Sequence, residues 1–186
     1  MIVMKCFSRL VAITIVLLLF VSPMKAGQMG LPAAWDGVWR GTTTLFWAMG
    51  KVETAAMELH VSPLTDGKAK TWQVSYEFSD RREARAYEIR PADGAGRFII
   101  DEKNGFLIDN YLSGNTLYSQ FTINGNLVTT RFELQGKTMA VELTMFDARN
   151  PRRTKLTGGN FEVASFSPKY IQRGILRRES AGAKHE

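Results

Sequence analysis

Short runs of alternating apolar and polar residues fill most of the chain between positions 35 and 178. In residues 71–79, a tryptophan, a valine, a tyrosine and a phenylalanine alternate with polar side chains. Residues 128–134 and 138–146 show the same alternation. Because successive side chains of a β-strand point to opposite faces, each run predicts a strand with one buried side.

Turn residues separate these runs. Asp-Gly stands at 66–67 and 93–94, and Asn-Gly stands at 104–105 and 124–125. Both dipeptides suit the positive backbone angles of hairpin turns. No helical periodicity of useful length is present. We predict strands over residues 37–47, 55–62, 71–79, 85–90, 97–102, 106–112, 116–123, 127–134, 138–146, 160–166 and 170–177.

The links between these runs are short, which predicts that neighbours in sequence are neighbours in space, as in an up-and-down meander. A flat sheet of this length would leave two exposed edges, and closure into a barrel removes them. We therefore predict an all-β fold, an antiparallel up-and-down meander of about ten strands closed into a barrel, in preference to a sandwich. This single domain covers residues 27–178, and residues 179–186 form a flexible tail.

The first 26 residues have a different composition. Lys5 and Arg9 precede an apolar run over residues 10–21, and small residues follow it. This order is that of a secretory signal peptide. The run is about twelve residues long, whereas a transmembrane helix needs roughly twenty. We predict a signal peptide at 1–26 and a periplasmic or secreted protein. An uncleaved membrane anchor is the alternative, because Met24 is larger than the usual residue near a cleavage site.

Removal of this segment changes the charge and the cysteine content. Residues 1–26 carry three basic residues and no acid, so the formal net charge falls from +6 to +3. That mild basicity indicates no nucleic-acid partner. The only cysteine, Cys6, also lies in the segment. The exported chain then has no thiol, which excludes thiol catalysis and cysteine-ligated metals.

Histidine is nearly absent from the chain. His60 lies on the polar face of its predicted strand, and His185 lies in the tail. Two separated histidines provide no ligand set for zinc or copper, and no Ser–His–Asp arrangement can be built from them. The sequence also lacks a G-x-S-x-G motif. We therefore expect no metal, no cofactor and no enzymatic activity.

The inward faces of the predicted strands are rich in aromatic and flexible apolar side chains. Such a lining suits an apolar ligand if the barrel is wide, and simply fills it if the barrel is narrow. Periodicity does not separate these alternatives for any one residue, although a closed meander of about ten strands usually has interior space to spare. The candidate ligand-binding residues are Trp47, Met57, Leu59, Trp72, Tyr76, Phe121, Phe132, Met139 and Leu143.

The start of the first predicted strand reads Gly37-Val38-Trp39. A Gly-x-Trp at this position resembles the lipocalins and the wider calycin group. The resemblance implies that Trp39 closes one end of the barrel, at the strand that Gly37 begins, and packs against a basic residue near the last strand. Arg173 and Arg177 are the candidates for that residue. The resemblance also implies transport or sequestration of small hydrophobic molecules.

Three functions are weighed. The first is an exported, noncatalytic barrel that binds a small hydrophobic or amphipathic ligand, such as a lipid, in its interior. The alternative is a cell-envelope interaction module with a packed core, which docks through its outer surface or the basic loop 149–155, within an irregular segment at 148–159. An outer-membrane barrel is third, because the outward faces carry Gln73, Glu77 and Glu142.

Export is directly testable. We expect the protein from its own host to begin near Gly27 and to lie outside the cytoplasm. N-terminal sequencing and intact mass would show this. A full-length product found in the cytoplasm would contradict it.

Overall fold

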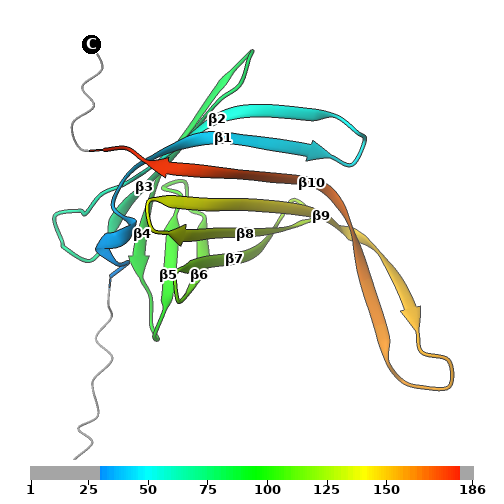
Figure 1. Cartoon of the computed structure of the whole chain (residues 1–186). Coiled ribbons are helices and arrows are strands. Elements are labelled where there is room, and N and C mark those ends of the chain that lie inside the picture. The colour runs from blue at the N-terminus through cyan, green and yellow to red at the C-terminus, as the bar shows by residue number, and fades with distance from the viewer. Residues whose placement is uncertain (1–29, 181–186) are drawn as a thin grey trace, which may run out of the picture.

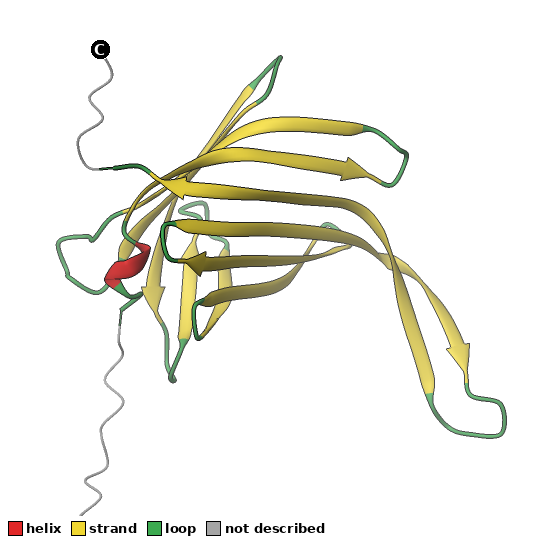
Figure 2. Cartoon of the chain, viewed as in Figure 1, coloured by secondary structure: helices red, strands yellow, loops and turns green. Residues whose placement is uncertain are grey.

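Ten antiparallel strands follow one another around a closed barrel in the computed structural model, which describes residues 30–180 (Figure 1). Strands and short turns make up nearly all of it (Figure 2). The elements are η1 (Ala33–Trp35), β1 (Gly37–Trp47), β2 (Val52–Val61), β3 (Lys70–Glu77), β4 (Arg82–Pro91), β5 (Arg97–Asp101), β6 (Leu107–Ser113), β7 (Thr116–Ile123), β8 (Asn126–Gln135), β9 (Thr138–Lys155) and β10 (Glu162–Arg178).

Each strand pairs with its neighbours in sequence, and the pairing of β1 with β10 closes the ring. The order around the barrel is β1-β10-β9-β8-β7-β6-β5-β4-β3-β2. Trp39 stands opposite Arg178 at one end of the seam, and Trp47 stands opposite Tyr170 at the other. The predicted all-β meander, closed into a barrel, is confirmed.

The last hairpin differs from the prediction. The two predicted strands at 160–166 and 170–177 merge into one strand, β10, which begins at Glu162 and has register shifts between Ser165 and Ser167 and between Pro168 and Tyr170. The segment 148–159, expected to be irregular, is strand up to Lys155, and β9 and β10 continue together beyond the barrel. A hairpin outside the barrel buries neither face, so its sequence needs no alternation to form strands. For this reason the alternation pattern did not predict the continuation of β9 through residues 148–155.

The hydrophobic core fills the half of the barrel next to η1, which we call the closed half. Trp35, Trp39 and Trp72 are almost wholly buried there. The Trp72 ring lies edge-on to Phe132, at 5.1 Å between centroids, and 6.3 Å from Trp35. The other half, bounded by the β1–β2 and β3–β4 turns, is the open half. Six further apolar side chains are less than 2% exposed in the core, namely Leu59, Val61, Ile89, Leu117, Met139 and Leu176.

Two glycines allow the closing strands to approach each other. A Cβ added to Gly41 would lie 2.1 Å from the carbonyl oxygen of Ile175. A Cβ added to Gly174 would lie 2.6 Å from the carbonyl oxygen of Thr42. Real Cβ contacts are not this short, so a side chain at either position would force β1 and β10 apart. The seam of the barrel therefore requires glycine on both strands.

The predicted signal peptide at 1–26 and most of the predicted tail lie outside the described residues. Glu179, the first residue of that tail, is held in place: its N–H donates to the carbonyl oxygen of Val38 at 2.8 Å, and its carboxylate pairs with Arg40. Within residues 30–180, no helix has the length and apolar character needed to cross a membrane.

The packing of Trp39 predicts a large cost of truncation. Trp39→Ala should lower the free energy of unfolding by about 3–5 kcal/mol, because it removes a wholly buried aromatic side chain. Glu77→Ala, on the exposed face of β3, should cost less than about 0.5 kcal/mol. Urea melts of both variants test this, and equal losses would contradict the assignment of the faces.

Candidate functional site

The closed half of the barrel is plugged by η1. The indole Nε1 of Trp39 donates a hydrogen bond to the carbonyl oxygen of Trp35 at 2.9 Å. The Lys70 ammonium lies 2.5 Å from the Asp36 carboxylate and 3.4 Å from the carbonyl oxygen of Pro32. These contacts fix the helical turn across the end of the barrel. A ligand therefore has no route through this end.

Arg178 completes the plug. Its guanidinium lies over the Trp39 ring, 4.8 Å from the centroid, and donates to the carbonyl oxygens of Ala34 and Asp36. Gly37 adopts a φ of 129° beneath it, and a Cβ there would lie 3.2 Å from Arg178 Nε. Because Gly37 has no side chain, the Arg178 guanidinium can pack against the Trp39 ring.

This identifies the basic partner of Trp39 as Arg178, not Arg173 or Arg177. Strand alternation explains the difference: Arg178 follows the buried Leu176 by two positions and shares its inward face, whereas Arg177 points outward. Arg173 is exposed on the outside, 3.9 Å from the Glu142 carboxylate. The sequence prediction placed the interaction on the right strand but on the wrong residue.

Four of the predicted ligand-binding residues lie deep in the core. Met57, Leu59, Trp72 and Met139 are at most 3% exposed and pack against one another and their neighbours in the closed half. Their side chains form part of the packed core, although Met57 also borders a small internal hollow, and a ligand-binding role for these four residues stays a prediction. Alternation indicates which face a side chain is on, but not how far along the barrel it lies.

The remaining five lie nearer the open half. Tyr76, Phe121, Phe132 and Leu143 are half-buried, and Trp47 is 40% exposed at the mouth. The Trp47 ring stacks on Tyr170 at 4.9 Å between centroids. Tyr76, Phe132 and Leu143 border an internal hollow of only about 20 Å³. Side chains therefore fill the middle of the barrel. Interior surface that a ligand could reach begins between this filled part and the mouth of the open half.

The open half carries polar side chains that the sequence analysis did not identify. Glu83, Arg85 and Tyr87 lie on the same face of β4 as the buried Ile89, so they face the interior. Burial raises the pKa of Tyr87, and the nearby charge of Arg85 lowers it in part. The signal was the alternation of these residues with Ala84, Ala86 and Glu88, but charged residues on a strand are usually interpreted as outward.

A chain of hydrogen bonds orients the tyrosine on β10. The Tyr170 hydroxyl donates to Gln172 Oε1 at 2.7 Å, and Gln172 Nε2 donates to Thr43 Oγ1 at 3.1 Å. Thr43 donates in turn to the carbonyl oxygen of Ala55 at 3.4 Å. Gln172 and Thr43 are buried, so this chain links β10, β1 and β2 inside the barrel. It holds the phenol of Tyr170 against the interior.

Burial controls the protonation of the interior tyrosines. Desolvation raises the pKa of Tyr76 and of Tyr170, and the proximity of Tyr76 contributes to the rise at Tyr170. Burial also raises the pKa of Tyr87. All three phenols therefore stay protonated at neutral pH and can donate hydrogen bonds. Together with Arg85 they form a donor-rich surface, which we call the tyrosine–arginine site.

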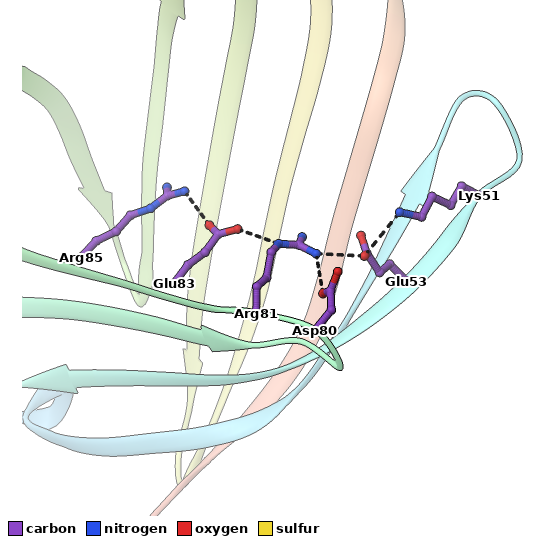
Figure 3. Close-up of polar contacts among 6 residues, drawn as sticks. All are labelled: Lys51, Glu53, Asp80, Arg81, Glu83 and Arg85. Carbon is purple, nitrogen blue, oxygen red and sulfur yellow. Dashed lines mark hydrogen bonds and ion pairs between the residues drawn. The ribbon is translucent and has the colours of Figure 1, made fainter.

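An ion-pair network connects this site to the rim (Figure 3). Glu83 accepts from Arg85 and from Arg81, each at 3.2 Å. Arg81 also donates to Glu53 at 3.2 Å, and Lys51 lies 3.4 Å from the same carboxylate. The network runs from β4 across the β3–β4 turn to β2. It positions Arg85 at its inner end.

The larger hollows lie on the outside of the barrel. One of about 720 Å³ covers the outer faces of β5 to β8, where Tyr111 and Tyr118 are exposed. Another, of about 470 Å³, lies between Phe46 and Arg131. Their side chains point away from the sheet, so both are surface grooves rather than the barrel interior. Among the described residues, no cluster of three or more His, Cys, Asp or Glu side chains could hold a metal ion.

Several solved structures share this fold. A protein of unknown function from the DUF3598 family of Nostoc punctiforme matches with a TM-score of 0.54 and 10% identity, over 81% of this chain and 50% of that one. The S-type phycobiliprotein lyase CpeS of Guillardia theta matches with a TM-score of 0.54 and 6% identity, over 80% and 90%. Rv2717c of M. tuberculosis matches with a TM-score of 0.51 and 10% identity, over 80% and 94%.

At these identities the likeness shows the fold alone. The predicted barrel fold is shared with these structures, whereas the resemblance to the lipocalins and the calycin group stays a prediction. The chain spans half the length of the Nostoc protein. No protein-family model and no curated protein matches the sequence.

One of these structures overturns the expectation of a protein without enzymatic activity. CpeS is named a lyase and has the same barrel fold. The scarcity of histidine and cysteine is therefore not a sufficient reason to exclude catalysis in a barrel of this kind. We withdraw that expectation.

The raised tyrosine pKa values predict a loss of stability at high pH. The unfolded chain releases the phenol protons near pH 10, whereas the folded protein retains them to higher pH. The folded state then binds more protons, so the free energy of unfolding falls as the pH rises above about 10. In urea melts at pH 8 and pH 11 (the latter about one unit above an ordinary tyrosine pKa), Tyr170→Phe should lose less stability than the unsubstituted protein. Equal losses would contradict the role of Tyr170.

Proposed function

We propose that the open half of the barrel binds a small amphipathic molecule with an apolar body and a carboxylate. The observation that carries this proposal is Arg85, which faces the interior beside Tyr76 and Tyr87. A guanidinium presents five donors in a planar fork that matches a carboxylate. Glu83 engages one end of that fork at 3.2 Å. The donors that remain suit an acidic group on a ligand.

The apolar body of the ligand would lie against the side chains above the filled middle of the barrel. Phe121, Leu143 and Met145 are half-buried on the inward faces of β7 and β9. Methionine and aromatic side chains adapt to ligands of different shape. The stacked rings of Trp47 and Tyr170 lie at the mouth. This combination favours an amphipathic molecule over a sugar or a nucleotide.

Two further findings support the proposal. A phycobiliprotein lyase is among the proteins with this fold, and that function fits a small-molecule site in the barrel. The order of basic, apolar and small residues in 1–26 supports action outside the cytoplasm, in the periplasm or the medium.

Arg85→Gln tests the site. The variant should bind oleate about tenfold to a hundredfold more weakly, because it loses a charge-assisted hydrogen bond of about 1.5–3 kcal/mol. Biliverdin, a linear tetrapyrrole with two carboxylates, is the second probe and should show the same loss. Isothermal titration calorimetry and the intrinsic tryptophan fluorescence, to which Trp47 at the mouth contributes, would measure both.

Two controls accompany this experiment. Arg82→Gln removes the same charge from the outward face of β4 and should leave affinity unchanged. Oleyl alcohol has the chain of oleate without the charge, so Arg85→Gln should barely alter its binding. The absence of saturable binding of either acidic probe, or equal binding by the Arg85 and Arg82 variants, would overturn the proposal.

A further inference from the structure

The distal part of the β9–β10 hairpin, residues 147–167, stands away from the barrel as a two-stranded arm (Figure 1). Asp147 is the last residue of β9 that pairs with β8; beyond it the two strands pair only with each other, and the register shifts in β10 between Ser165 and Tyr170 mark where the arm leaves the barrel. Every residue from 152 to 168 is exposed. The arm therefore adds nothing to the hydrophobic core, and its side chains face solvent.

Apolar side chains gather at the tip of the arm. The N–H of Leu156 donates to the carbonyl oxygen of Phe161 at 3.0 Å, so these two residues face each other across the turn. Val163 lies two positions further along the strand, on the same face as Phe161. Phe161 is 77% exposed, and Leu156 and Val163 are 58% exposed. The tip sequence from Leu156 to Phe161 carries no charge.

Basic residues follow directly behind this tip. The acids Asp147 and Glu162 are both paired, Asp147 with Arg149 at 3.6 Å and Glu162 with Arg153 at 2.6 Å. Glu162 stands opposite Lys155 in the register of the two strands, but among the described residues neither Lys155 nor Arg152 forms an ion pair. The arm therefore carries a net charge of +2 from four basic residues, which are Arg149, Arg152, Arg153 and Lys155.

We propose that this arm docks the protein on a lipid bilayer that contains anionic lipids. An uncharged apolar tip followed by cations matches the order of layers in a bilayer, in which hydrocarbon lies beneath anionic headgroups. An acidic protein surface would complement Arg152 and Lys155, whereas a bilayer would also take the exposed ring of Phe161 into its hydrocarbon layer. A bilayer with anionic lipids therefore has a binding partner for the cations and another for the apolar tip.

Docking of this kind would bring the mouth of the barrel close to the membrane. The arm continues from β9 and β10 at the open end, the end at which Trp47 and Tyr170 lie. A membrane is a reservoir of amphipathic molecules, so the arm and the tyrosine–arginine site would then serve one process. The inference rests on the arm alone and does not require the proposed ligand site.

Vesicle co-sedimentation tests the inference with the chain from Gly27 onward, which contains all ten strands and the seam. We expect binding to vesicles of phosphatidylcholine mixed with phosphatidylglycerol, little binding to phosphatidylcholine alone, and weakening by salt. Arg152→Gln and Lys155→Gln should each lower the affinity for the mixed vesicles about fivefold. Phe161→Ser should lower it further, because it removes the most exposed apolar side chain of the tip.

Two matched variants serve as controls. Phe106→Ser removes a 56% exposed aromatic from another turn of the open end, and Arg82→Gln removes a cation from the outer wall. Both should bind the mixed vesicles like the unsubstituted chain. Phe161→Trp gives an independent local readout, since its fluorescence should be quenched by brominated lipids.

The inference is overturned if the vesicles are not bound, or if the arm variants bind like the controls. Capture of an acidic protein by the arm, with no vesicle binding, would overturn it in favour of a protein partner. Oleate binding by Phe161→Ser should be unchanged. Failure of the arm is thereby distinguishable from failure of the ligand site.

Discussion

The antiparallel pairing of β1 with β10 is the contact on which the rest of the structure depends. It converts an open meander with two free edges into a ring, and it brings residues more than a hundred positions apart into register. The close approach at Gly41 and Gly174 makes this pairing possible. Every interior contact between the first and last strands follows from it, including the hydrogen bond from Gln172 to Thr43 and the stacking of Trp47 on Tyr170.

The closed ring is divided into two halves with different chemistry. One half is a dry core in which aromatic side chains pack without space for a ligand, and Arg178 and η1 cover its end. This half provides the stability that a chain without disulfides must draw from burial. The other half can then tolerate half-buried tyrosines and an inward-facing Arg85, which cost stability by themselves. The packed half offsets this cost, which allows the other half to keep polar side chains in its interior.

The arm, like the open half, is free to carry side chains that do not stabilise the fold. The barrel is already closed by the proximal parts of β9 and β10, so their distal parts need not contribute to the core. The exposed Phe161 and cations without an ion pair, such as Arg152, do not stabilise the fold there. Exposed apolar side chains of this kind often mark interaction sites. The arm and the open half lie at the same end, which concentrates the candidate functions away from the core.

Alternation and turn chemistry determined from sequence alone that the chain is an antiparallel meander, with boundaries such as Gly37–Trp47 and Thr116–Ile123. These features are local, because a strand's two faces and the angles of a hairpin turn depend on adjacent residues. The depth of a side chain along the barrel axis, in contrast, depends on contacts between distant segments. Only the tertiary structure decided that Trp72 lies in the packed core and Tyr76 at the site, although both share one face of β3.

The same limit explains the residues that were missed or misplaced. Arg85 was not identified as a candidate because charged side chains on a strand usually face solvent, and only closure of the ring shows that its face of β4 looks inward. Arg178 rather than Arg177 meets Trp39 because the register across the seam sets which inward side chain reaches the ring. The sequence determined the strands and their faces through short-range sterics. The tertiary structure decided the site and the arm, because register, depth and closure arise from contacts between distant segments.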